Sequence, residues 1–152
     1  MNQKSLVPEF TRFLQEHNMR VTPNRLTVFR ELENAPGPMT VPELASRVAE
    51  QGLNVATIYR IIETLMSLNV VHPVLIDHQS VGYELIEPFR QHHDHLVCRN
   101  CGKIVAIFDE RLESVLKTIS DDQSFAIDFH QLEVHGICPD CRSKTPNSPK
   151  PA

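Results

Sequence analysis

The sequence predicts an α+β protein with two domains. Its first half carries apolar residues at helical spacing, and the helical segments run directly into two β-rich segments. Its second half is expected to contain short strands around a single helix. All four cysteines lie in that half, in two Cys-x-x-Cys pairs. These observations predict helices with a β-hairpin, followed by a small α/β domain built around a metal.

The composition is that of a globular protein. Hydrophobic residues make up 41% of the 152-residue chain, which excludes a chain that is disordered throughout. Charges interrupt the N-terminal segment and no stretch approaches a membrane span, so we expect a soluble, cytoplasmic protein with reduced thiols and no membrane contact. The net charge is −4, with the acidic excess in residues 77–152. Composition does not predict DNA binding, but leaves room for a DNA-binding surface on the first half.

Apolar spacing and capping residues predict four short helices, which with their caps occupy residues 8–18, 22–33, 40–52 and 54–67. Thr22 is the expected N-cap of the second helix, ahead of a proline at the first helical position. Thr40 and Glu43 form a capping box for the third helix, and Gly52 ends it.

The segments 70–76 and 82–86 are rich in β-formers and flank a polar turn, so they predict a hairpin. Helices followed by a two-stranded ribbon indicate a winged helix, in which the last helix, 54–67, enters the DNA major groove. A small helical module that binds another protein is the alternative.

The second half is expected to alternate strands with one helix. A short strand leads into the first cysteine pair, and strand 103–108, helix 109–120 and strand 125–135 follow. The apolar residues of this helix are expected to face inward: Leu112, Val115, Leu116 and Ile119. The tail from Ser143 has nothing to bury and is expected to be disordered.

The two cysteine pairs, Cys98/Cys101 and Cys138/Cys141, are separated by 36 residues. Four thiolates in two tight turns match the tetrahedral coordination of zinc, at Zn–S distances of about 2.3 Å. No cysteine is left as a nucleophile, so we predict a closed, structural Zn(Cys)4 site. Paired disulfides or a redox dithiol are the alternatives.

Four segments of this chain carry a resemblance, in order and at matching spacing. They are RVTPNR at 20–25, ATIYR at 56–60, HHDHLVCRNCG at 92–102 and CPDC at 138–141. They resemble the ferric uptake regulator (Fur) family of bacterial metal-sensing transcription factors, and look nearest to its zinc uptake regulators (Zur).

The resemblance implies a winged-helix DNA-binding domain over residues 1–86 and an α/β dimerisation domain over 87–142, with the tail at 143–152. It also implies a homodimer, double-stranded operator DNA as partner, and an exchangeable metal near the hinge between the domains. By similarity, helix 54–67 reads DNA. Its contacts would be Thr57, Tyr59 and Arg60, with Arg20 as a further phosphate ligand.

Two metal sites are expected from the histidine-rich run, because alternate residues of an extended segment point to opposite sides. His93 and His95 point to the hinge site, where Glu84 matches a family carboxylate. Two other family ligand positions hold Pro38 and Ala106, which cannot bind metal.

A replacement ligand is therefore expected at the hinge, and His72 resembles the one that zinc uptake regulators contribute. We predict a four-coordinate site of His72, Glu84, His93 and His95, which favours zinc over Fe(II) or Mn(II). Asp77 or His78 could take the place of His72.

The other side of the run, His92 and Asp94, matches the family's dimerisation-domain site, completed by Glu113 and His130. A hydrogen-bonded network without metal is the alternative for this group. His135 is expected to pack or to be solvated.

These residues predict a metal-dependent repressor of zinc uptake, with structural Zn(II) and exchangeable regulatory Zn(II). The alternative within the family is a regulator that responds to Fe(II), to manganese or to peroxide. A zinc hydrolase would need an open coordination position beside a general base, and no cleft signature indicates one, so we predict that the chain is not an enzyme. A zinc-ribbon interaction module would not need Tyr59 and Arg60 exposed.

Overall fold

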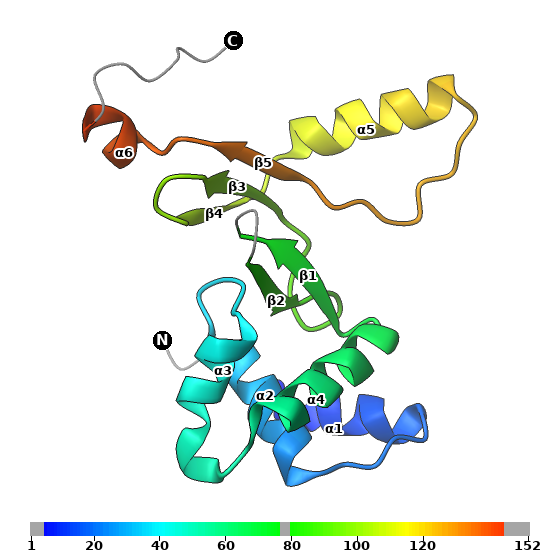
Figure 1. Ribbon diagram of the computed structural model, residues 1–152. Coiled ribbons are helices and arrows are strands. Elements are labelled where there is room, and N and C mark those ends of the chain that lie inside the picture. Colours follow the sequence, from blue (N-terminus) through cyan, green and yellow to red (C-terminus); the bar gives the residue numbers. More distant parts are fainter. Residues whose placement is uncertain (1–4, 77–79, 145–152) are drawn as a thin grey trace. The chain divides into compact units, whose positions relative to one another are not determined.

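The computed structural model describes residues 5–76 and 80–144. The chain divides into two compact units, residues 1–91 and 92–152 (Figure 1). Among the described residues, no helix is both long and apolar enough to cross a membrane.

The first unit begins with helices: α1 (Val7–Glu16), α2 (Pro23–Asn34), α3 (Val41–Arg47), the 3-10 turn η1 (Ala49–Gln51) and α4 (Val55–Ser67). The expected caps are confirmed. Thr22 accepts a hydrogen bond from the N–H of Arg25, and Thr40 and Glu43 form both bonds of a capping box. Asn54 caps α4 through the N–H of Thr57 at 2.8 Å. Local sequence therefore determines where α2, α3 and α4 start.

A β-ribbon follows α4, formed by β1 (Val71–Leu75) and β2 (Val81–Leu85). The two strands are antiparallel and place His72 opposite Glu84. The segment before α3 joins this ribbon, since Met39 and Tyr83 exchange two backbone hydrogen bonds of 2.9 and 2.8 Å. The result is a winged helix with its wing tied back to the helices (Figure 1).

Aromatic rings from three segments form part of the core of this unit. Phe10 of α1 stacks on Phe29 of α2 with ring centroids 4.0 Å apart. Phe89, from the segment after β2, meets the ring of Phe29 edge-on at 5.2 Å and is buried. The first unit consequently extends past residue 86, where the sequence placed its end, to residue 91.

The second unit contains a three-stranded sheet and two helices: β3 (Asp94–Cys98), β4 (Ile104–Ile107), α5 (Glu110–Asp122), β5 (Glu133–Gly136) and α6 (Pro139–Lys144). The strand order is β4-β3-β5. The β3–β4 pair is antiparallel and the β3–β5 pair is parallel, which sets Cys98 opposite Gly136. This register brings the two cysteine pairs to the same end of the sheet.

Three expectations for the second unit were wrong. The strand expected over 125–135 covers only 133–136, because no described strand pairs with the residues before it. Val115 and Ile119 of α5 were expected to face inward, but they are 55% and 54% exposed. Ser143 and Lys144, expected in a disordered tail, complete helix α6, while residues 145–152 lie outside the described part.

Candidate functional site

The four cysteines converge on one point of the second unit. Their sulfur atoms all lie within 4.8 Å of one another, and all four are free thiols. The Cys101 and Cys138 sulfurs are 3.7 Å apart, close to the edge of about 3.8 Å of a tetrahedron with zinc–sulfur bonds of about 2.3 Å. The first turn closes through Gly102, whose positive φ of 71° suits glycine and whose N–H donates to the Cys98 carbonyl. The donor set fits a structural zinc ion.

The surroundings of the cluster favour a bound cation. The backbone N–H of Cys138 donates to the Cys98 sulfur at 3.2 Å and lowers the pKa of that thiol to about 6. The N–H of Lys103 acts to lower the pKa of Cys101, but the neighbouring thiols of Cys141, Cys98 and Cys138 outweigh it and raise that pKa to about 12. One thiolate forms readily, but its negative charge opposes the ionisation of the other three thiols. A divalent cation is therefore needed to hold several thiolates in one cluster.

A second cluster in the same unit combines two imidazoles with two carboxylates. It consists of His92, Asp94, Glu113 and His130, whose ligand atoms all lie within 4.8 Å of one another. The Nε2 atoms of His92 and His130 are 2.9 Å apart. Glu113 Oε1 lies 3.5 Å from the first of these nitrogens and 3.3 Å from the second.

The buried residue of this cluster is Asp94, with 3% exposure. Its Oδ1 accepts a hydrogen bond from the Leu132 N–H at 3.0 Å, and its Oδ2 lies 3.6 Å from His130 Nε2. The carboxylate is thus held by the backbone and aimed at the imidazole. This arrangement fits both a nitrogen–oxygen metal site and a hydrogen-bonded network.

The residues expected at the hinge site lie as two pairs, one in each unit. In the first unit, His72 Nε2 is 2.9 Å from Glu84 Oε1, and the Glu84 side chain is only 1% exposed. Within the described residues, His72 Nδ1 is buried and has no hydrogen-bond partner. A buried nitrogen with a lone pair available is chemically suited to a metal ion. Asp77 and His78, the alternative ligands, lie outside the described residues.

In the second unit, the rings of His93 and His95 are 4.8 Å apart, centre to centre. The His93 ring also stacks on Phe108 at 5.4 Å. His95 is 2% exposed, and its backbone N–H donates to the Leu132 carbonyl. The His93 ring and the His95 backbone thus have contacts within the second unit. Ala106, which stands at a family ligand position, lies opposite His95 in the ladder and has no donor atom.

Helix α4 presents a polar face on the first unit. Its buried side is apolar: Ile58, Ile61, Ile62 and Leu65. Tyr59, with 47% exposure, and Arg60 point away from that core, and Thr57 is half-buried at the start of the helix. Arg20 is exposed, and its carbonyl accepts a hydrogen bond from Arg25. The side chains expected to meet DNA are thus accessible.

The sequence analysis missed one residue near these sites. Arg90 places its guanidinium 3.5 Å from Glu84 and within hydrogen-bond distance of two carbonyls at the end of α2. The sequence signal that could have identified it is the neighbouring apolar residue Phe89, which packs against the helices of the first unit.

This architecture and these metal centres define the class: a metal-responsive DNA-binding regulator. A sequence model of the ferric uptake regulator family matches residues 16–135. The ferric uptake regulation protein of Bacillus subtilis (strain 168) is 33% identical over 135 residues, which cover 86% of this chain and 91% of that protein. The chain belongs to the ferric uptake regulator family and is a metal-responsive transcriptional regulator.

Solved structures agree with this assignment. The crystal structure of the Vibrio cholerae ferric uptake regulator is similar with a TM-score of 0.71 at 26% identity, covering 85% of this chain and 99% of that one. A zinc uptake regulator complexed with zinc and DNA is similar with a TM-score of 0.63 at 26% identity, covering 95% and 97%. Members of this family regulate transcription and are not enzymes.

Proposed function

We propose that this chain is a zinc-responsive repressor that binds operator DNA in the cytoplasm as a homodimer. Zinc held by the four cysteines would be structural. A second, exchangeable zinc ion would bind His72, Glu84, His93 and His95 and restrict the two units to a DNA-competent arrangement. The observation that carries the proposal is the pair of histidine-containing donor sets, one in each unit, together with a complete cysteine centre in the second unit.

The proposed choice of metal depends on the number of donors. The four residues supply three imidazoles and one carboxylate, while the family positions at Pro38 and Ala106 supply none. Four nitrogen and oxygen donors suit tetrahedral zinc better than the five or six ligands that Fe(II) and Mn(II) prefer. The similarity to a zinc uptake regulator bound to zinc and DNA also supports zinc.

The proposed DNA contacts lie on α4 and at the start of α2. Arg60 would bind phosphate or guanine, Tyr59 a thymine methyl group or phosphate, and Thr57 and Arg20 phosphate. The exposure of Tyr59 and Arg60, beside a fully apolar buried face, supports this assignment.

The proposed homodimer is supported by apolar surface on the second unit. Nine large apolar side chains in the described part of this unit are exposed: Leu96, Val105, Phe108, Val115, Ile119, Phe125, Ile127, Phe129 and Val134. Phe125 and Phe129 are 70% and 61% exposed. Such side chains gathered on one small unit are typical of a surface that another protein covers. A second copy of the chain is the occupant that the family indicates.

The response to metal would follow from a population shift. Zinc stabilises the DNA-competent arrangement only by as much as it binds that arrangement better than the others. Changing a mostly incompetent population into a mostly competent one needs a difference of about 5 kcal/mol.

A titration of DNA binding tests the proposal. A duplex selected from a random pool in the presence of zinc serves as the operator, and its affinity is measured at buffered free Zn(II), Fe(II) and Mn(II). We expect zinc to strengthen binding, and His93→Ala to remove this effect while the cysteine-bound zinc remains. Replacing Cys98 should instead release that zinc and weaken the dimer. Equal affinity after removal of all labile metal would reject the proposal.

An Fe(II)-responsive regulator is the second candidate. The curated relatives, including the protein from Bacillus subtilis, are named ferric uptake regulation proteins. The same titration under anaerobic conditions separates the candidates, because the iron-responsive regulator would respond to Fe(II) at its physiological concentration and the zinc-responsive one to far lower free Zn(II).

A further inference from the structure

We propose that Arg90 is an internal counter-ion of Glu84, with which an incoming divalent metal ion must compete. Arg90 would thereby set the metal concentration at which the regulator responds. This inference rests on the proposed function, in which Glu84 is a metal ligand. It assigns Arg90 a role as a positioning residue and not as a ligand, because a guanidinium has no lone pair to offer.

The Glu84 carboxylate lies in a position where an ionised group needs a partner. Its side chain is 1% exposed. Oε1 lies 2.9 Å from His72 Nε2, and Oε2 lies 3.5 Å from an Arg90 guanidinium nitrogen. A buried carboxylate is costly unless a cation or hydrogen bonds compensate its charge. Arg90 supplies a permanent positive charge at this place whether or not metal is present.

Arg90 is held in place by contacts that do not involve Glu84. Its second terminal nitrogen donates to the carbonyls of Ala35 at 2.9 Å and of Leu32 at 3.4 Å. These carbonyls lie at the C-terminal end of α2, where the helix dipole attracts a cation. The neighbouring Phe89 ring fixes the backbone by packing edge-on against Phe10 at 5.7 Å and Phe29 at 5.2 Å. Arg90 is therefore pre-positioned beside the carboxylate.

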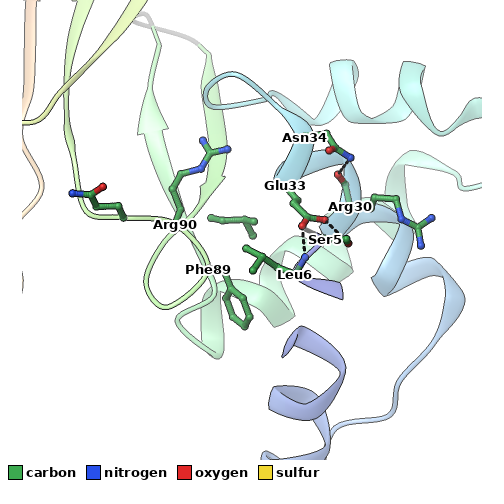
Figure 2. A pocket seen from close by; sticks show the side chains of 9 residues that line it. Ser5, Leu6, Arg30, Glu33, Asn34, Phe89 and Arg90 are labelled. Atoms are coloured by element: carbon green, nitrogen blue, oxygen red, sulfur yellow. Dashed lines mark hydrogen bonds between the residues drawn. The ribbon is translucent and has the colours of Figure 1, made fainter. Parts of the chain in front are cut away.

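A cavity gives the guanidinium room to withdraw. Its volume is about 560 Å³, and Figure 2 shows Arg90 and Phe89 among the side chains around it. Glu33 also lines this cavity, where it accepts hydrogen bonds from Ser5 and from the Leu6 N–H. The negative charge of Glu33 on this lining would partly compensate the charge of Arg90 when metal takes Glu84.

The sign of the effect follows from charge. A metal ion and a guanidinium on the same carboxylate repel each other, and this repulsion lowers the affinity of the site. Arg90→Gln keeps polar atoms near the α2 carbonyls but removes the charge. We expect it to strengthen zinc binding at the exchangeable site about tenfold. The metal-free protein should lose about 5 °C or more in Tm, because the buried carboxylate loses a cation.

The test measures zinc affinity by competition with a chromophoric chelator, with the cysteine centre kept loaded. Arg30→Gln is the matched control, since Arg30 lines the same cavity but is exposed to solvent. A second measurement is a double-mutant cycle of Tm values, taken without exchangeable metal. The decrease in Tm caused by Arg90→Gln should be smaller in the Glu84→Gln variant than in the natural protein. This cycle works for any variant that retains part of its thermal transition, and Arg90→Met, which also removes the charge, serves if Arg90→Gln does not fold.

The outcomes are distinct. Tighter zinc binding in Arg90→Gln, with no change in Arg30→Gln, supports the inference. A lower Tm with unchanged zinc affinity makes Arg90 a purely structural residue and overturns it, while the proposed function stands. If the natural protein binds no exchangeable ion at all, the proposed function itself fails.

Discussion

His72 and Glu84 stand directly opposite each other in the β1–β2 ladder, with Nε2 and Oε1 2.9 Å apart. The other ring nitrogen of His72 is buried without a hydrogen-bond partner among the described residues. Imidazole and carboxylate are thus presented together on one short ribbon. Whether His72 binds metal itself or only orients Glu84, its removal weakens the site.

The first prediction concerns His72. His72→Ala should lower zinc affinity at the exchangeable site by about 10- to 100-fold, which is the usual cost of losing a ligand or its orienting partner. Zinc competition with the cysteine centre loaded is the measurement. His135→Ala is the control, because His135 is paired with Glu133 in the second unit. Equal zinc affinities for His72→Ala and the natural protein would remove His72 from the site.

The second prediction concerns DNA contact. Arg60→Ala should lower operator affinity by about 1–3 kcal/mol without loss of folding, because its side chain is exposed on α4 and contributes nothing to the core. Fluorescence anisotropy with the selected duplex measures the affinity, and circular dichroism the fold. Lys117→Ala, the loss of an exposed charge on α5, should leave binding unchanged. An Arg60→Ala curve that overlies the natural one contradicts the assignment.

The third prediction concerns the exposed face of α5. Ile119→Glu should shift the protein toward monomer, because the proposed homodimer would bury a charge in place of an apolar side chain that is 54% exposed in the single chain. Analytical ultracentrifugation gives the oligomeric state. Lys117→Glu changes the same helix at a position paired with Asp121 and should have a much smaller effect. A dimer of Ile119→Glu as tight as the natural one would place the interface elsewhere.

The fourth prediction concerns Cys98 and pH. The folded-state pKa of this thiol, about 6, lies below the ordinary value of 9.0, so its ionisation stabilises the folded, metal-free protein. That stabilisation is fully present above pH 9 and is lost as the pH falls through about 6. In reductant and without metal, the Tm difference between the natural protein and Cys98→Ser should therefore grow from pH 6 to pH 9. Cys101→Ser should not remove this rise, since the pKa of Cys101 is raised. A Tm difference independent of pH would contradict the assignment.

The fifth prediction concerns the close approach at Gly82. A Cβ atom added there would lie 2.8 Å from Ile76 Cδ1 and 2.9 Å from Pro38 Cβ. Gly82→Ala should destabilise the first unit by about 1–3 kcal/mol through overpacking. Gly37→Ala, with nothing within 4 Å of the added atom, is the matched control. Equal denaturation midpoints for the two variants would show that the wing yields without cost.

Helix caps and apolar helix faces were predictable from the sequence. Strand pairing and the covering of apolar side chains, which depend on distant residues or on another chain, were not. The caps at Thr22 and Thr40 and the apolar face of α4 follow from residues within one or two helical turns. The strand expected over 125–135 is absent from its first part, 125–132, because alternation alone does not supply a ladder partner. Val115 and Ile119 show the apolar spacing of a core-facing helix, yet they are exposed. Spacing alone does not tell whether an apolar side chain packs within its own chain.

The same distinction applies to the sites. The cysteine centre was predictable because its spacing encodes tight turns with converging sulfurs. The contact of Arg90 with Glu84 was not, since it depends on Phe89 docking among rings from α1 and α2. The sequence assigned that segment to the second domain, 87–142, so no contact with the helices of the first was expected.

The parallel register that sets Cys98 opposite Gly136 has a consequence for folding. A metal shared by the two cysteine pairs closes a loop of 36 residues that contains all of α5. Such a cross-link reduces the conformational entropy of the unfolded chain. For a disulfide that closes a loop of this length, the effect stabilises the folded state by about 4 kcal/mol. Oxidants or chelators that remove the ion would therefore destabilise β5 and α5 together. Loss of regulation would then begin with local unfolding of the three-stranded sheet.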